Sequence, residues 1–190
     1  MLLRHGETAD NLAGRFLGRS DPPLTAEGLE RAHRARGGID LGGDCTVVSS
    51  PARRAIETAA ALGAAAPEVD DGFRELDFGA WEGLTPDEVA QQDPATYAAF
   101  ARGVLAAFPE GESVAEVWAR TSAAIATRVA DRLVVVTHAT VIRVVVAGLL
   151  GVPIDHYRAR FGRPGHLSLT ELEHHTGGWR LVAYGVPTGA

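Results

Sequence analysis

Four consecutive apolar residues, Leu133 to Val136, constrain the fold of this chain more than any other segment. A short β-branched run without polar alternation is typical of a strand that is buried on both faces of a sheet. The run Thr46-Val47-Val48-Ser49 has the same character, and helix-forming segments lie between the two runs. Strands that alternate with helices predict an α/β fold, here a three-layer α/β/α sandwich around a mostly parallel sheet.

Helix starts are marked by capping signals along the chain. Thr25 is a suitable N-cap, Ser50-Pro51 forms an N-cap and N1 pair, and capping boxes begin at Thr85 and Ser113. Single helices are expected over residues 26–36, 51–61, 113–129 and 140–149, and short helices over residues 86–102. The expected strands are 1–3, 46–49, a short edge strand at Val69, 133–136, and a closing hairpin of 167–172 and 180–184 around a turn at 174–178.

The length of 190 residues suits a single domain, residues 1–190, in which residues 80–112 form a small helical lid. The formal net charge is −6, so no overall attraction to nucleic acid or to an anionic membrane is expected. A phosphate site would have to be a local basic pocket. All 18 basic residues are Arg, which excludes lysine Schiff-base chemistry and the phosphate-loop lysine.

The single cysteine, Cys45, excludes an internal disulfide and a cysteine-rich metal site. Together with the lack of a signal peptide, it predicts a cytoplasmic protein. Residues 133–150 are apolar enough to raise the question of a membrane span, but they contain His138 and Arg143. An Arg near the centre of a membrane helix costs roughly 3 kcal/mol, so a strand followed by a buried helix is favoured. The oligomeric state is open, and a homodimer is one of the states the sequence allows.

Titratable side chains follow three of the predicted strands. Arg4 and His5 follow the first strand, Arg54 lies at the start of the helix after the second, and His138 ends the run at 133–136. Parallel strands bring such side chains to one edge of the sheet, and a loop adds Glu75. On its own, Arg4-His5 favours a charged surface turn. The full set suits phosphoryl transfer to a histidine, with guanidiniums around the oxygens and a carboxyl that protonates the leaving group.

The sequence resembles the histidine phosphatase superfamily, which is also called phosphoglycerate-mutase-like. The resemblance covers nearly the whole chain, and its motifs occur in order. The matching segments are Arg4-His5-Gly6-Glu7-Thr8 with Asn11; Pro23-Leu24-Thr25 with Gly28 and Ala32; Ser49-Ser50-Pro51 with Arg54-Ala55 and Thr58-Ala59; Glu75 with Phe78-Gly79 and Trp81-Glu82-Gly83; Gly111-Glu112-Ser113; and Val136-Thr137-His138.

The resemblance implies a role for each matching residue. His5 would be the nucleophile that forms a phosphohistidine, and Glu75 the general acid and then the base for water. Arg4 and Arg54 would bind the phosphoryl group, which His138 would contact as a cationic donor. No metal or other cofactor would be needed, because Arg and His supply the positive charge. The residues expected to contact substrate are Arg4, Asn11, Leu17, Gly18, Arg54, Trp81 and Ala139.

Several of these assignments have alternatives. Asn11 could only bridge turn backbone, and Arg54 could hold its own loop while Arg53 binds phosphate. Asp77 and Glu82 compete with Glu75 for the acid role. Trp81, Tyr97 and Phe100 suit the core of the lid as well as a substrate pocket. The remaining histidines match no motif, so surface or structural roles are expected; they are His33, His156, His166, His174 and His175.

Three departures from the family pattern affect the expected function. Leu17 replaces a frequent Gln, and Ala139-Thr140 replaces Gly-Gly after the second histidine, so the substrate is not determined. The first strand begins at Met1, where the family usually has a few more residues, which leaves open whether the native start lies upstream. The short continuation after Trp81 resembles the phosphatase branch. The expected function is hydrolysis of small phosphorylated metabolites; a phosphoglycerate-type mutase and a non-catalytic phospho-ligand-binding domain are the alternatives.

Overall fold

A six-stranded sheet forms the centre of the protein, in the order β3-β2-β4-β1-β5-β6. The computed structural model describes residues 1–41, 44–64, 66–128 and 130–189. In sheet order the strands are β3 (Glu68–Val69), β2 (Cys45–Ser49), β4 (Arg132–Thr137), β1 (Leu2–Arg4), β5 (Ser168–His175) and β6 (Gly178–Pro187). The first four of these are parallel and the last two form an antiparallel hairpin, so the prediction of a mostly parallel sheet is confirmed.

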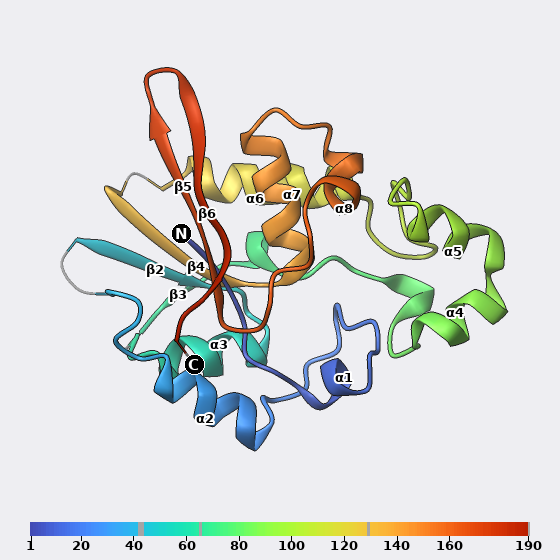
Figure 1. Cartoon of the computed structure of the whole chain (residues 1–190), viewed down its shortest axis with the longest axis horizontal. Helices are drawn as coiled ribbons and strands as arrows, with labels where there is room; N and C mark the ends of the chain where they lie inside the picture. Colours follow the sequence, from blue (N-terminus) through green and yellow to red (C-terminus); the bar gives the residue numbers. More distant parts are fainter. Residues whose placement is uncertain (42–43, 65, 129, 190) are drawn as a thin grey trace.

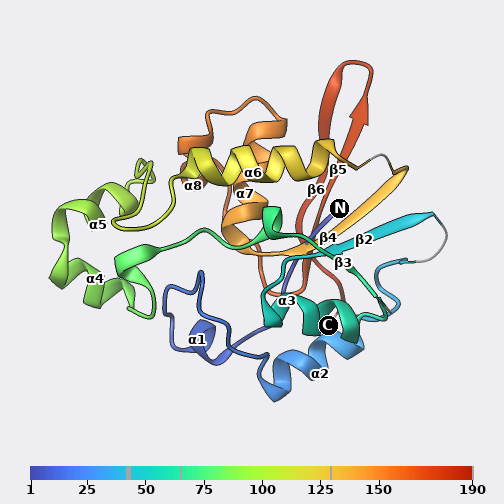
Figure 2. The ribbon, with the colours of Figure 1, turned by 180° about the vertical axis from the view of Figure 1, so that it is seen from behind.

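Helices cover both faces of the sheet, which gives the predicted three-layer sandwich (Figure 1 and, from behind, Figure 2). One face carries α2 (Ala26–Arg34) and α3 (Arg53–Ala61); the other carries α6 (Val114–Ala126), α7 (Ala139–Leu149) and α8 (Tyr157–Arg160), the last preceded by a 3-10 turn, η3 (Ile154–His156). Beyond the carboxyl ends of the parallel strands stand α4 (Pro86–Gln92) and α5 (Pro94–Ala101), while the short α1 (Ala9–Leu12) lies below them.

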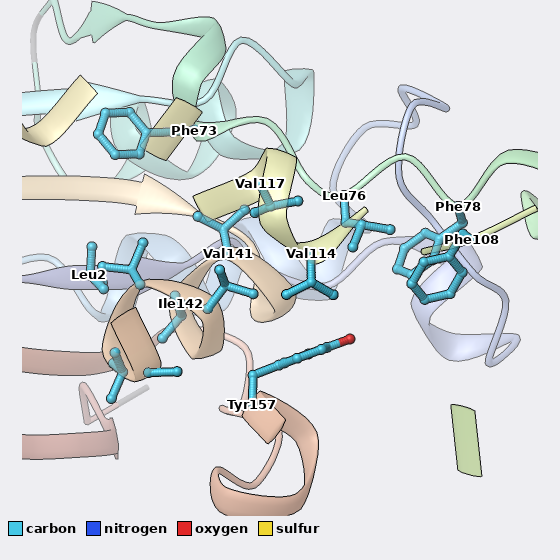
Figure 3. Packing of buried hydrophobic residues seen from close by; sticks show 14 of the residues in the cluster. Leu2, Phe73, Leu76, Phe78, Phe108, Val114, Val117, Val141, Ile142 and Tyr157 are labelled. Atoms are coloured by element: carbon cyan, nitrogen blue, oxygen red, sulfur yellow. The ribbon is translucent and has the colours of Figure 1, made fainter. Parts of the chain in front are cut away.

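The central strands are buried on both sides, as their sequences predict. In β1, Leu2 belongs to the large core under α6 and α7, whereas Leu3 belongs to a smaller core under α2 and α3. Val135 and Val136 of β4 divide between the same two cores. Successive strand side chains point to opposite faces, so a fully apolar run is required here. Figure 3 shows the larger core.

Both predicted capping boxes are present. The Thr85 hydroxyl accepts from Glu88 N while Glu88 accepts from Thr85 N, and Ser113 and Glu116 form the same reciprocal pair. The short helices predicted over 86–102 are α4 and α5, which are separated where Asp93 leaves helical geometry and its side chain caps α5. The predicted end of the next helix, at Val129, lies outside the described residues.

The start of α3 differs from the prediction. The helix begins at Arg53 with Ala52 as N-cap, two residues later than the expected Ser50-Pro51 pair. Ser50 instead continues the strand direction, because its N–H donates to Val136 O at 2.9 Å. Its hydroxyl lies 2.7 Å from Nε2 of His138 and is therefore not a simple helix cap.

The closing hairpin is longer than predicted, and its turn is tighter. β5 continues to His175 and β6 begins at Gly178, so His174 and His175 are strand residues, and the His174 ring packs on Trp179 at 5.0 Å. Within the described ranges, no helix combines the length and apolar character that a bilayer crossing would need. The apolar stretch at 133–150 is β4 followed by the buried helix α7.

Candidate active site

The register of the sheet places His5 next to His138. Arg4 of β1 pairs with Thr137 of β4 in a parallel arrangement, so the residue after each strand reaches the same edge. The two imidazole centroids are 5.1 Å apart, and both side chains are buried. This edge is where ligands bind in open α/β sheets.

The imidazole of His5 is held in one tautomer. Its Nδ1 lies 2.6 Å from the carbonyl oxygen of Gly6, which can only accept, so Nδ1 carries the proton and Nε2 keeps its lone pair. Burial, and then the charges of Arg54 and Arg4, lower the pKa of His5 well below its ordinary value. His5 is therefore neutral at physiological pH and suited to nucleophilic attack through Nε2.

The expectation of a cationic His138 is not supported by the charges around it. Burial, followed by Arg54 and His5, lowers the pKa of His138 well below its ordinary value. The Ser50 hydroxyl accepts from Ala52 N at 3.3 Å and lies 2.7 Å from His138 Nε2; in the tautomer in which this hydroxyl donates to Nε2, the imidazole proton is on Nδ1. That Nδ1 is buried and has no hydrogen-bond partner among the described residues. His138 thus offers a neutral N–H donor, and a nearby anion would raise its pKa.

Arg4 is positioned by a histidine that no sequence motif indicated. Its Nη1 donates to Pro164 O at 2.8 Å, and its Nη2 lies 3.2 Å from Nε2 of His166. Nδ1 of His166 lies 3.2 Å from the carbonyl oxygen of His5. His166 therefore connects the backbone at His5 to the guanidinium of Arg4. Burial and Arg163 lower the pKa of Arg4 to about 9, so it remains charged near neutral pH.

Arg54 is fully buried and combines two roles. Nη1 donates to Ser20 O at 2.8 Å and Nη2 to Gly18 O at 3.0 Å, which is the loop-holding role weighed as an alternative. Its charge nevertheless acts on both His5 and His138, since it is the leading charge that lowers their pKa values. Arg53 is exposed and pairs with Glu57 at 2.7 Å, so it does not take the place of Arg54.

Glu75 is the carboxyl that reaches the site. It is buried, Oε1 accepts from Leu76 N at 2.9 Å, and Oε2 accepts from Thr140 N at 3.3 Å. The competing carboxyls are occupied elsewhere. Asp77 pairs with Arg19 at 3.1 Å, and Glu82 accepts from the backbone N–H groups of Gly18 and Arg19 at 2.8 Å each.

A cavity of about 430 Å³ opens at this edge of the sheet, and its volume suits a small metabolite. The predicted site residues that line it are Arg4, His5, Asn11, Leu17, Glu75 and Ala139. Asn11 also completes a capping box with Thr8, so the turn-bridging alternative is present as well. Among the described residues of the wall, Glu75 is the one carboxylate, whereas five are Arg. The expected local basic pocket is present in a chain whose net charge is −6.

Three predicted substrate contacts, Trp81, Gly18 and Arg54, are not among the residues that line this cavity, and neither is the predicted catalytic residue His138. The indole of Trp81 is 2% exposed and packs edge-on against Phe100 and Phe108, in the core of the lid, so it does not line the cavity. Gly18 borders a second, smaller cavity with Arg19 and Asp21. A Cβ at Gly18 would collide with the carbonyl oxygen of Leu76, so this glycine permits close packing of two loops.

Sequence analysis missed several side chains of the cavity wall. Arg143 is one helical turn from Ala139 on a helix that begins after His138, a spacing that could have indicated it. Arg158 and Arg163 follow no motif and reach the cavity only through the tertiary fold. Within the described ranges, no group of three or more His, Cys, Asp or Glu side chains is arranged to hold a metal ion.

Two neighbouring histidines, a carboxyl and several guanidiniums thus gather at the carboxyl edge of an α/β sheet, an arrangement suited to phosphoryl transfer. A sequence profile of the histidine phosphatase superfamily (branch 1) matches residues 1–187, and the chain belongs to this superfamily.

Relatives over the full length include both phosphatases and a mutase. A glucosyl-3-phosphoglycerate phosphatase from Mycolicibacterium vanbaalenii is 32% identical, over 93% of this chain and 84% of that protein. A probable phosphoglycerate mutase GpmB from Proteus mirabilis is 30% identical, over 98% of this chain and 90% of that protein. The solved structure of mycobacterial glucosyl-3-phosphoglycerate phosphatase matches with a TM-score of 0.84 and 32% identity, over 97% of both chains. The chain spans 37% of the length of a Mycobacterium tuberculosis bifunctional protein to which it is 38% identical.

Proposed function

We propose that the protein is a histidine acid-type phosphatase that hydrolyses small phosphomonoesters through a phosphohistidine on His5. The observation that carries this proposal is the 2.6 Å contact from Nδ1 of His5 to the carbonyl oxygen of Gly6, which leaves Nε2 free as a nucleophile. Glu75 in the same cavity supplies the second group that the reaction requires. The similarity to glucosyl-3-phosphoglycerate phosphatases supports hydrolysis as the outcome.

The proposed reaction has two steps. In the first, Nε2 of His5 attacks phosphorus, the bond from phosphorus to the ester oxygen breaks, and protonated Glu75 gives its proton to the leaving oxygen. In the second, ionised Glu75 takes a proton from water, the water oxygen attacks phosphorus, and the P–N bond breaks to release inorganic phosphate. Arg4, Arg54 and the Nδ1–H of His138 stabilise the charge on the phosphoryl oxygens. The scheme requires no metal ion, because guanidiniums supply the positive charge.

The first test is release of nitrophenol from p-nitrophenyl phosphate in the presence of EDTA. Turnover that is retained with EDTA and lost in His5→Ala supports the proposal. His33→Ala, at an exposed position of α2, is the matched control and should retain full activity. Turnover that depends on an added metal ion, or that persists in His5→Ala, contradicts the proposed mechanism.

The intermediate provides a second, independent test. A sample quenched in base during turnover should keep a phosphohistidine that acid removes, and the label should be absent from His5→Ala. The mutase alternative is examined with 3-phosphoglycerate, because a mutase yields 2-phosphoglycerate whereas a phosphatase yields inorganic phosphate. A non-catalytic domain would bind phosphate esters with no turnover. We also propose that the protein is cytoplasmic, because its single cysteine, Cys45, is free.

A further inference from the structure

We propose that Arg143, Arg158 and Arg163 form a second anion subsite, which selects phosphomonoesters whose leaving group carries a carboxylate or a further phosphate. This inference rests on the proposed phosphatase function and adds a substrate class to it. The three residues come from α7, from α8 and from the loop that leads to β5, and all three line the cavity that contains His5 and Glu75.

Two of the three guanidiniums are held in place by aromatic rings. Arg143 lies 5.0 Å from the ring centroid of Tyr157 and donates through Nε to Ala139 O at 3.2 Å. Arg158 lies 3.7 Å from the ring centroid of Phe100, at the lid. Such contacts fix a cation in position without neutralising it. The guanidiniums of Arg143 and Arg158 are therefore fixed by packing and are not freely solvated.

None of the three arginines forms an ion pair with a carboxylate in the described part of the chain. The ion pairs of the described Arg side chains are all formed by other arginines. One of these is Arg15, which also lines the cavity and whose Nη1 lies 3.4 Å from Oε2 of Glu88. Arg143 is only 6% exposed, and Nε of Arg158 is buried without a hydrogen-bond partner among the described residues. Arg163 is exposed, and Glu75 is the charge that acts on it most strongly. A buried guanidinium without an ion pair, such as that of Arg143, is costly, so this part of the wall is adapted to an anion from outside the chain.

The charges of the arginines on the cavity wall act on one another. After burial, the main charges that lower the pKa of Arg158 are Arg143 and Arg163, and these two also lower the pKa of Arg4. Arg4 lines the cavity beside His5, where the phosphoryl group would lie. The three further guanidiniums exceed what one phosphate ester needs, and a second anion on the leaving group accounts for them.

Matched substrate pairs test the subsite. For the carboxylate, 3-phosphoglycerate is compared with glycerol 3-phosphate; for the second phosphate, fructose 1,6-bisphosphate is compared with fructose 6-phosphate. The wild-type kcat/KM should favour the anionic member of at least one pair by about 10- to 100-fold, as expected for one or two charge-assisted contacts. The double variant Arg158→Gln with Arg163→Gln should remove most of this preference, because kcat/KM falls far more for the member whose leaving group carries the second anion than for the other member.

Arg160→Gln is the control, because Arg160 lies on α8 outside the cavity wall and is exposed. It should leave the preference unchanged. Equal kcat/KM values for both members of both pairs, or a double variant that keeps the preference, would overturn the subsite. If instead no phosphate is released from any of these substrates or from p-nitrophenyl phosphate, the phosphatase function itself fails. The two failures are thus distinguishable.

Discussion

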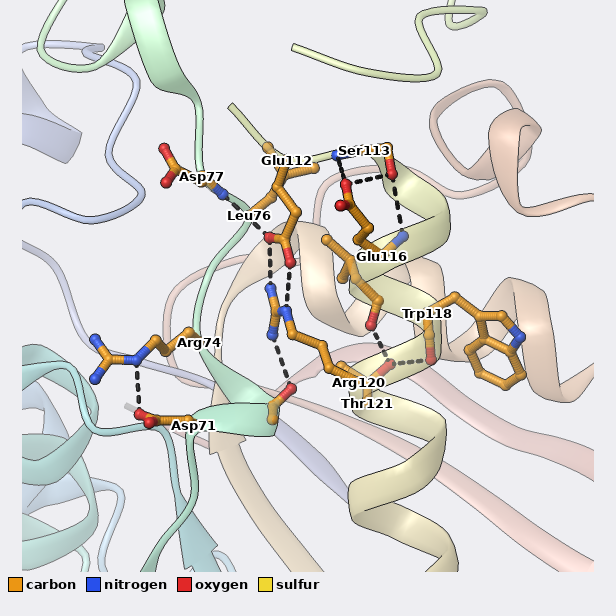
Figure 4. A network of polar contacts seen from close by, with 12 residues as sticks. Asp71, Arg74, Leu76, Asp77, Glu112, Ser113, Glu116, Trp118, Arg120 and Thr121 are labelled. Atoms are coloured by element: carbon orange, nitrogen blue, oxygen red, sulfur yellow. Dashed lines mark hydrogen bonds and ion pairs between the residues drawn. The ribbon is translucent and has the colours of Figure 1, made fainter. Parts of the chain in front are cut away.

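Arg120 of α6 and Glu112 form a two-pronged ion pair, with Nε 2.7 Å from Oε1 and Nη2 2.9 Å from Oε2 (Figure 4). The same guanidinium donates to the backbone carbonyls of Gly72 at 2.8 Å and Glu75 at 3.3 Å. Oε2 of Glu112 accepts from Asp77 N at 3.3 Å. The pair therefore holds the backbone on both sides of the proposed general acid, although neither residue lines the cavity.

The first prediction concerns this pair. Arg120→Met should reduce kcat about 10-fold for glycerol 3-phosphate and much less for p-nitrophenyl phosphate, because a displaced acid matters most for a poor leaving group. KM should change little. Stability should fall by about 1–3 kcal/mol, measured by urea unfolding. Arg74→Met is the control, since Arg74 in the same loop pairs with exposed Asp71. Equal losses of kcat on the two substrates would assign Arg120 a merely structural role.

The second prediction separates Glu75 from its neighbours. Glu75→Gln should reduce kcat for glycerol 3-phosphate by roughly 10²- to 10⁴-fold, the usual contribution of general acid–base catalysis. The loss on p-nitrophenyl phosphate should be much smaller in the phosphorylation step, because nitrophenolate leaves without a proton. Asp77→Asn removes a carboxylate that pairs with Arg19 and should affect both substrates alike. Steady-state and single-turnover rates on the two substrates provide the measurement.

The third prediction is that the free energy of unfolding depends on pH through the protonation of His166. Burial, and then the charge of Arg4, lower the pKa of His166 to about 3. The unfolded chain, with a histidine pKa near 6.5, takes up the proton first as the pH falls. The contribution of this group is therefore favourable to folding above about pH 6.5 and is lost progressively toward pH 3, at up to about 1.4 kcal/mol per pH unit.

His166→Gln should flatten this pH dependence. The free energy of unfolding, measured in urea at about pH 7, 6 and 5, should fall less steeply in the variant than in the wild type. His33→Gln, at an exposed position on α2, should keep the wild-type slope. Unchanged slopes in both variants would mean that His166 is protonated at the same pH in the folded and unfolded chain.

The order of strands and helices was predictable because each depends on local signals. The apolar run at 133–136 and the capping boxes at Thr85 and Ser113 specify their elements within a few residues. The start of α3 was not predictable in the same way. Ser50 has the residue type of an N-cap, but its hydroxyl contacts His138, which follows β4 and is 88 positions away in sequence. At this position a tertiary contact, and not local helix capping, determines the role of the serine.

The site residues were likewise predictable only where a local sequence signal marks them. His5 directly follows a strand, and Glu75 lies in a loop whose motif is visible in the sequence. The fold brings both residues to one cavity. Trp81 has the residue type of a pocket wall, but the lid buries it among other aromatic rings. Arg158 and His166 carry no local signal, because their positions depend on the path of the chain between α7 and β5.

The last prediction concerns the contact between the Gly18 loop and the acid loop. In Gly18→Ala, the new Cβ would overlap the carbonyl oxygen of Leu76 and Oε1 of Glu82, so the loop must move away. Gly18 O accepts from Arg54 at 3.0 Å, and this movement would therefore release one of the bonds that orient the guanidinium. Overpacking should cost about 1–3 kcal/mol, or roughly 3–10 °C in Tm, and kcat/KM should fall on every substrate, because the phosphoryl group is common to all. Gly177→Ala, in the open hairpin turn, should change neither quantity beyond experimental error. A Gly18→Ala protein with wild-type Tm and activity would mean that the two loops are not packed as tightly as described.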